Sequence, residues 1–264
     1  MSSASIPSSI GNTLKMQIFY LQDYAVLAFE SVRDIFNGKI DRVDLVEQMD
    51  QIGVGSLPII AVALACVGGV IVLNAASQFS RFGEKVLTGD ALSLSLLREL
   101  GPVFTALLVA GRNATGMASQ LGSMLVTEQV DAMRVMGIDP VRKLVTPRVL
   151  ATALVLPLLA ALGDAAGLLG GFLVASYTLH INAEEFWTRA IKALALGDLV
   201  IGFSKPLVFG FIIATVGCYQ GLRVEGGTAG VGRATIMAFV VASLGVLVTD
   251  LFLTKLLLYV FNMG

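Results

Sequence analysis

The feature that most constrains this chain is a set of five long apolar segments, at about residues 56–79, 91–117, 147–178, 199–222 and 234–261. Each is longer than the ~20 mostly apolar residues that a helix needs to cross a bilayer. Of the 264 residues, 56% are hydrophobic and 14% are charged, whereas soluble domains average roughly 45–50% and about 25%. The chain is therefore predicted to be an all-α, polytopic membrane protein with five transmembrane helices.

The residues before the first span form a separate N-terminal region. Apolar side chains recur every three or four residues from Ile10 to Ile35, which is the helical period. Charged residues are interspersed, so we expect an amphipathic helix that lies in the membrane interface; a soluble helix packed on a partner is the alternative. Asn37-Gly38 ends it. We assign residues 1–52 to this interfacial region and 53–264 to the transmembrane domain, with a second short amphipathic stretch at 41–51.

The loops indicate how the chain is oriented. If the N-terminus is cytoplasmic, eleven Lys and Arg residues lie on that side and four on the other. Positively charged loops favour the cytoplasm. We therefore predict a cytoplasmic N-terminus and a C-terminus on the opposite side.

Two amphipathic loop segments are expected to be short helices. The cytoplasmic connection at 119–146 contains one that ends at Gly137, and Asp139-Pro140 begins a new turn. Such a helix either acts as a lever for a cytoplasmic partner or caps the bundle, and spacing favours neither. The external segment at 180–197 contains another, capped by Asn182. Phe186 and Trp187 are expected at the membrane surface, as is His180.

Several classes of protein are excluded. Gly227 and Gly232 have the spacing of a phosphate-binding loop, but Arg233-Ala234 follows where Lys-Ser/Thr is needed. The chain therefore should not hydrolyse ATP, and residues 226–232 are expected to form a flexible turn. A single histidine and two cysteines, both in apolar runs, do not indicate a Cys/His metal site or a disulfide scaffold. A net charge of −1 does not indicate nucleic acid. We predict a non-enzymatic chain with no cofactor of its own.

Glycines in the third span predict close helix packing. Gly163, Gly167 and Gly171 repeat every four residues, a spacing that lets helix backbones approach closely. A hinge or a path for substrate is the alternative.

Ionisable residues within the apolar segments are candidates for function, because a charge at the bilayer centre costs at least ~2.5–3.5 kcal/mol. Asp164 and Asp250 are each expected to pair with Lys205. Arg98 and Glu99 are expected at the mouth of a polar cavity, and they need not pair with each other because adjacent residues point about 100° apart. The competing class is an ion-coupled transporter that uses Asp164 and Asp250, although five spans without internal symmetry do not favour it. A scaffold without transport activity is a third reading.

Several motifs resemble those of the MlaE-type ABC transporter permease family. The central ones are Gly111-Arg112, Gln120–Met124, Val126–Arg134, Met136–Pro140 and Pro147-Arg148. Leu96–Pro102 and Gly230–Thr235 fit the same family. The resemblance covers about residues 50–262.

The resemblance implies partners and a location. Members are inner-membrane subunits of bacterial lipid transporters, form homodimers, bind two cytoplasmic ABC ATPase subunits that carry ATP and magnesium, and pair with a periplasmic ring of MCE-domain proteins. A small cytoplasmic regulator is a further partner that the resemblance allows. Phospholipid is the usual cargo.

The resemblance also implies sites. The lipid cavity would be lined by Leu73, Asn74, Gln78, Arg98 and Glu99, with the Arg98 guanidinium suited to a headgroup phosphate. The helix that couples to the ATPase would contain Glu128, Asp131, Arg134, Met136, Gly137 and Asp139. This chain departs from the family at Ser119-Gln120 and Leu125, where a carboxylate and a basic residue are common, which suggests a missing ion pair.

Overall fold

The computed structural model describes residues 8–37, 40–82 and 87–260, and within these ranges the regular structure is helical without strands. The helices are α1 (Ser8–Phe36), α2 (Arg42–Phe79), α3 (Thr88–Ser95), α4 (Gly101–Val109), α5 (Thr115–Val126), α6 (Gln129–Val135), α7 (Thr146–Leu179), α8 (Ala183–Lys192), α9 (Leu196–Gly221) and α10 (Gly227–Val260). Three π-helical turns interrupt them, namely η3 (Leu96–Leu100), η4 (Ala110–Ala114) and η5 (Val141–Val145), and a short 3₁₀ turn, η1 (Ser80–Phe82), follows α2.

Five continuous helical segments are long and apolar enough to cross a membrane, as the sequence predicts. They are Arg42–Phe79, Thr88–Val126, Val141–Leu179, Leu196–Gly221 and Gly227–Val260. Four of them extend several residues beyond the apolar segments, because backbone hydrogen bonding continues where hydrophobicity stops. The stretch at 41–51 accordingly joins the first span in the single helix α2, which contains Pro58.

The expectation of a flexible turn at 226–232 is wrong. Only Gly226 and Gly227 have positive φ, at 85° and 65°, and α10 begins at Gly227. The turn therefore needs two glycines, and the glycines at 230 and 232 are helical. Gly230 is buried close to the Glu225 carbonyl, so its small size serves packing.

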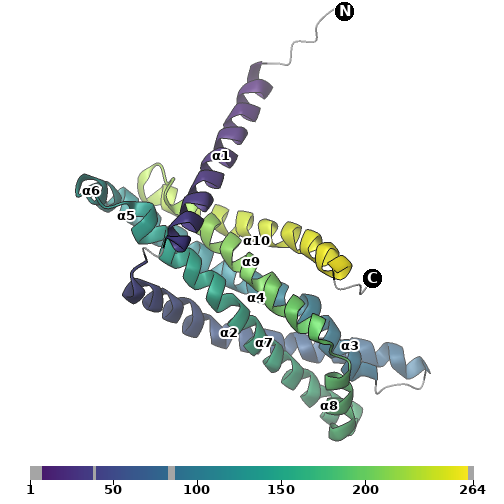
Figure 1. Cartoon of the computed structure of the whole chain (residues 1–264). Helices are drawn as coiled ribbons and strands as arrows, with labels where there is room; N and C mark the ends of the chain where they lie inside the picture. Colours follow the sequence, from purple (N-terminus) through teal and green to yellow (C-terminus); the bar gives the residue numbers. More distant parts are fainter. Residues whose placement is uncertain (1–7, 38–39, 83–86, 261–264) are drawn as a thin grey trace, which may run out of the picture.

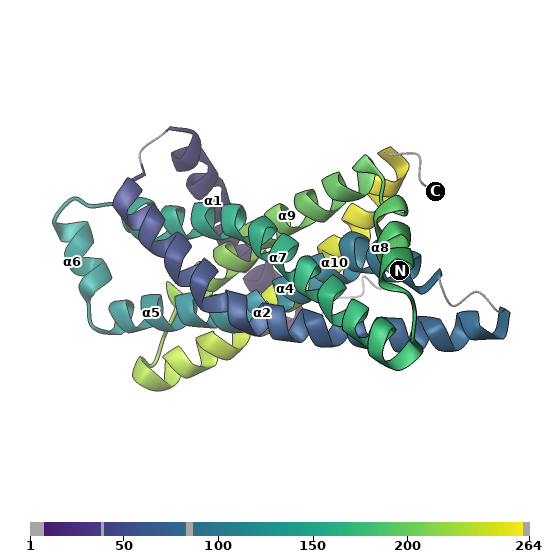
Figure 2. The ribbon, with the colours of Figure 1, turned by 90° about the horizontal axis from the view of Figure 1, so that it is seen from below.

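The most extensive contact between two helices in the bundle is that of α2 with α7. Helix α9 packs on α7, and α10 packs on α9 (Figures 1 and 2). Gly163, Gly167 and Gly171 lie along the α7 face that meets α2. A Cβ at Gly163 would lie 2.9 Å from Ile60 Cγ2, and one at Gly171 would lie 3.2 Å from the Gly68 carbonyl oxygen. A Cβ at Gly167 would lie 2.7 Å from Leu96 Cδ2. The absence of a side chain at position 167 thus also leaves room for Leu96 of the second span.

Helix α1 projects from one end of the bundle and is anchored near its C-terminal half (Figure 1). The hydroxyls of Tyr24 and Thr215 are 2.9 Å apart, and Tyr219 donates to the Tyr20 carbonyl at 2.9 Å. Arg223 and Asp23 add an ion pair. Burial raises the pKa of Tyr24, and its bond to Thr215 partly offsets this. A place for α1 in the membrane interface stays a prediction.

Helix α8 begins as expected, because Asn182 Oδ1 accepts a hydrogen bond from the Glu184 amide at 2.9 Å. The expectation for Phe186 is wrong. Its side chain is buried rather than at a surface, with ring centroids 5.6 Å from Phe172 and 5.7 Å from Trp187. The helix packs on α3 and α7, with Phe186 and Ala190 buried.

Candidate functional site

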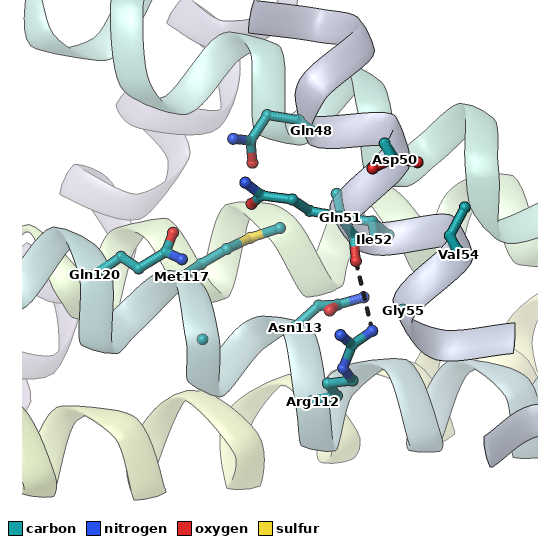
Figure 3. Close-up of a pocket in the computed structure, with 11 residues that line it drawn as sticks. Gln48, Asp50, Gln51, Ile52, Val54, Gly55, Arg112, Asn113, Met117 and Gln120 are labelled. Atoms are coloured by element: carbon teal, nitrogen blue, oxygen red, sulfur yellow. Dashed lines mark hydrogen bonds between the residues drawn. The ribbon is translucent and has the colours of Figure 1, made fainter. Parts of the chain in front are cut away.

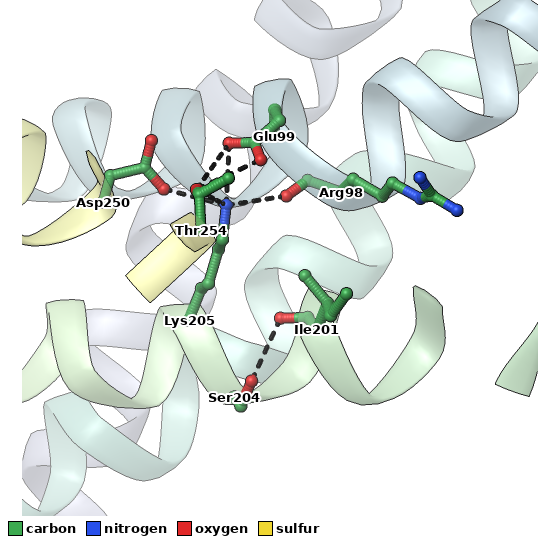
Figure 4. Close-up of polar contacts among 7 residues, drawn as sticks. All are labelled: Arg98, Glu99, Ile201, Ser204, Lys205, Asp250 and Thr254. Carbon is green, nitrogen blue, oxygen red and sulfur yellow. Dashed lines mark hydrogen bonds and ion pairs between the residues drawn. The ribbon is translucent and has the colours of Figure 1, made fainter. Parts of the chain in front are cut away.

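A cluster of charged side chains lies inside the bundle around Lys205, which is 0% exposed. Its Nζ lies 2.7 Å from Glu99 Oε2, 3.0 Å from Asp250 Oδ1 and 2.7 Å from Thr254 Oγ1 (Figure 4). The ammonium also donates to the Arg98 carbonyl at 3.0 Å. That carbonyl belongs to the π-helical turn η3, and π turns are frequent at functional sites. The second, fourth and fifth spans are thereby joined at one cation.

Arg98 points away from this cation. Its Nε donates to Asp198 Oδ1 at 2.6 Å, and Asp198 is fully buried. The other carboxylate oxygen of Asp198 accepts from the Ala195 amide at 2.8 Å and so caps α9. Arg98 and Glu99 thus have different partners, as adjacent helical residues should. Sequence reasoning missed Asp198, although an acidic residue in the first turn of a helix is a recognisable signal.

Only part of the expected pairing with Lys205 is confirmed. Asp250 pairs with it, but Asp164 does not. Asp164 is 4% exposed, and its Oδ1 has no hydrogen-bond partner among the described residues. This oxygen lies against Gly101 of the second span, whereas Lys205 extends toward Glu99 and α10. Sequence alone does not show which face of α7 carries the carboxyl group.

In one copy of the chain, the five residues predicted to line a lipid cavity do not share one environment. Leu73, Asn74 and Gln78 are exposed on the later half of α2. The charged groups of Arg98 and Glu99 are engaged by α9 and α10. A cavity that used all five would need the exposed face of α2 to be covered.

The predicted coupling residues lie on an excursion between α5 and η5, which protrudes at one end of the molecule (Figure 2). Glu128 begins it with φ of 59°, and Gly137 ends it with φ of 75°. Asp131 and Arg134 pair at 2.8 Å, and Asp139 Oδ1 accepts from the Val141 amide at 2.9 Å. Val135 is 89% exposed and Met136 is 67% exposed. The excursion therefore presents apolar side chains outside the bundle.

A polar pocket of about 440 Å³ lies between α2 and the second span, nearer the same end (Figure 3). Arg112 donates to Ser56 Oγ at 3.0 Å and to the Gln51 carbonyl at 3.4 Å. Asn113 donates to the same Ser56 hydroxyl at 3.3 Å. The guanidinium lies over Gly55, where a Cβ would collide with it. These hydrogen bonds link α2 to the second span.

Gln120, one of the departures from the family pattern, lies at the edge of this pocket. Its Oε1 accepts from Arg148 at 3.4 Å. Arg148 is 9% exposed and also donates to the Leu144 carbonyl at 2.6 Å. A neutral amide thus faces a buried cation at this position.

A second cavity, of about 660 Å³, separates the start of α2 from the end of the excursion. Lys143 bridges it by pairing with Asp44. Among the residues that the structure describes, no three His, Cys, Asp or Glu side chains are grouped as metal ligands would be.

Five membrane-length helices, three of which are joined by ion pairs at the buried Lys205, define a multi-pass membrane protein. Residues 45–256 match the profile of a family described as Permease MlaE. Probable ABC transporter permease proteins are 38% identical in Rickettsia typhi, over 89% of this chain and 90% of that protein, and 39% identical in Synechocystis, over 84% and 85%. The intermembrane phospholipid transport system permease protein MlaE of Haemophilus influenzae is 34% identical over 81% and 82%.

The chain belongs to the MlaE permease family. The resemblance found in its motifs is thereby confirmed over most of its length.

Proposed function

We propose that the chain is the transmembrane subunit of an ABC transporter that moves phospholipids between the inner membrane and a periplasmic MCE protein. ATP hydrolysis takes place on a separate cytoplasmic subunit, which carries the ATP and magnesium. This chain contributes the path through the membrane and no catalytic residue. Family membership supports the permease role, and the name of the Haemophilus relative supports the cargo.

The observation that carries the proposal is the exposed excursion containing α6. A short amphipathic helix between two spans, with Val135 and Met136 outside the bundle, suits insertion into a groove of a soluble partner. The backbone is held by left-handed residues at both ends and by the Asp139 cap. A helix fixed in this way can transmit a push from the ATPase to the spans on either side.

Two copies of the chain complete the transporter. The exposed side of α2 carries Leu73, Asn74 and Gln78. A second copy facing it would enclose apolar walls for acyl chains. The Arg98 guanidinium, which pairs with Asp198 in one copy, is the cation suited to the headgroup phosphate. The N-terminus faces the cytoplasm, in agreement with the distribution of Lys and Arg.

Affinity purification tests the proposal. The tagged chain, extracted from its native membrane in mild detergent, should retain an ATPase with a Walker motif at one copy per chain. Met136→Glu places a charge on the docking helix and should reduce the recovered ATPase at least tenfold. Ile191→Glu is the matched control, because Ile191 is also exposed and apolar but lies on α8 at the other end. Loss of the ATPase in both variants, or in neither, contradicts docking through α6.

Charge reversal on the same helix tests coupling separately. Glu128→Lys or Asp131→Lys should leave ATP hydrolysis in the assembled complex while lowering lipid transfer in proteoliposomes. Asp131→Lys also removes the pair with Arg134, an exposed ion pair worth ~1 kcal/mol or less, so the fold should survive. If both variants transferred as much lipid per ATP hydrolysed as the unchanged chain, Glu128 and Asp131 would have no role in coupling hydrolysis to transport.

A further inference from the structure

Asp164 carries a buried carboxyl group that the charge cluster and the proposed lipid path do not use. The residue is 4% exposed in the middle part of α7, and its Oδ1 has no hydrogen-bond partner among the described residues. Native proteins satisfy the great majority of their buried polar atoms. A buried carboxyl group without a protein partner still has its hydrogen-bonding capacity for a ligand that reaches it.

The nearby cations are engaged by other carboxylates. Lys205 pairs with Glu99 and Asp250, and Arg98 pairs with Asp198. Within the described residues, no lysine or arginine forms an ion pair with Asp164. An ionised carboxylate without a cation is costly inside an apolar span. The neutral acid avoids this cost, and a carboxylic acid can donate one hydrogen bond as well as accept.

The carboxyl group borders a crevice of about 200 Å³ between α7 and α9. The other lining residues are apolar or glycine, namely Leu97, Ala161, Ala165, Leu168, Leu199, Gly202 and Phe203. Leu199 and Phe203 are 42% and 45% exposed, so the crevice opens on the outer surface of the bundle. Both helices belong to segments that are long and apolar enough to cross a membrane.

Gly101 makes room for the carboxyl group. A Cβ at position 101 would overlap Asp164 Oδ1. The second span therefore needs glycine here in order to keep the carboxyl group at the crevice. Leu97, one turn earlier on the same span, forms part of the crevice wall.

We propose that this crevice binds the glycerol-ester region of a bilayer lipid, with one acyl chain against the apolar wall and the Asp164 acid donating to the ester carbonyl. The volume excludes a partner helix, whose diameter is about 10 Å, and is below the ~300–1,000 Å³ of pockets for larger ligands. It suits a segment of one lipid chain. The site lies on the outside of the bundle and does not depend on the proposed transport function.

The test compares two lipids that differ in the ester carbonyl. The full-length chain is reconstituted in nanodiscs of dioleoyl phosphatidylcholine or of its diether analogue, and treated with the apolar reagent diisopropylcarbodiimide. The acid gives its proton to a carbodiimide nitrogen and its oxygen adds to the carbodiimide carbon, and acyl transfer then leaves a stable N-acylurea on the residue. Mass spectrometry of peptides measures the rate of modification at Asp164.

We expect modification at least threefold faster in the diether lipid, because the ester lipid occupies the acid. Ala165→Leu, which fills the crevice from its exposed side, should suppress modification in both lipids. Asp164→Asn verifies the modified position. Leu158→Asp on the exposed face of the same helix, outside the crevice, corrects for differences in reagent partitioning.

Equal corrected rates in the two lipids would overturn the proposal, since they would show that the acid is not held by an ester. An absence of modification in both lipids would overturn it as well, because the carboxyl group would then be ionised or closed off from the lipid. Modification that persists in Ala165→Leu would show that the reagent reaches Asp164 by another route, and would equally contradict the lipid crevice.

Discussion

At the scale of single residues, the chain tolerates the buried ammonium group of Lys205 by surrounding it with several acceptors. Lys205 has two carboxylates, a hydroxyl and a carbonyl around its ammonium group. Removing one partner of a buried ion pair is more costly than replacing the whole set by apolar groups, because the remaining charge loses its compensation. The cluster should therefore behave as a unit.

Replacement of Lys205 tests this behaviour. Lys205→Leu should destabilise the protein at the lower end of the range of about 3–5 kcal/mol, because Glu99 is 39% exposed and partly screened. The midpoint of thermal unfolding in detergent measures the loss. The triple variant with Glu99→Gln and Asp250→Asn should regain much of it. A triple variant as unstable as the single one would show that Lys205 acts through packing alone.

At the scale of elements, the fold depends on how closely α2 and α7 approach. Gly68 and Gly167 face each other so closely that a Cβ on Gly68 would overlap the Gly167 carbonyl. In lipid, helices associate through packing of small residues rather than by exclusion of water. The glycine repeat therefore sets the position of α7, and through α7 the positions of α9 and of the Asp164 crevice.

Gly68→Val should separate these two helices and cost about 1–3 kcal/mol, as overpacking of a filled interface does. The measurement is again the thermal midpoint of the purified chain. Gly232→Ala is the matched control, since Gly232 is also helical and has nothing within 4 Å of its added Cβ. It should be neutral or stabilising by ~0.4–1 kcal/mol. Equal losses in both variants would argue against close packing at Gly68.

At the scale of the whole molecule, the two outer spans are the least enclosed. Buried residues make up 33% of the most apolar part of α2 and 17% of that of α10, against 56% for α7 and α9. Apolar spans can face lipid, but α2 also exposes Asn74, Ser77 and Gln78. Polar groups on a lipid-facing helix are unfavourable. This surface is the one that we expect a second copy to cover.

The native Cys66 allows a cross-linking test of whether a second copy covers that surface. It is exposed on α2, whereas Cys218 is buried. A membrane-permeable bis-maleimide should link two copies through Cys66 and double the apparent mass on a denaturing gel. Cys66→Ser should abolish the linked species. If membranes at native abundance yield only singly modified chains, the two α2 helices do not face each other.

Local patterns predicted much of the fold correctly. Apolar length located the five spans, and Asn182 predicted the cap of α8. Gly137 and Asp139 predicted where the segment that contains α6 ends and where the next helical turn begins. These features depend on residues close in the chain. The roles proposed for Leu73, Asn74, Gln78 and the α6 residues stay predictions, because they depend on partner chains and on lipid.

Sequence by itself determined that this is a multi-pass helical protein of the MlaE permease family, since hydrophobic length and local motifs are read along the chain. Only the tertiary structure decided that Lys205 pairs with Glu99 rather than Asp164, that Asp198 holds Arg98, and that Phe186 is buried. Each of these depends on the rotation of one helix about its axis relative to its neighbours. Side-chain packing between distant segments sets that rotation, and hydrophobicity alone does not encode it.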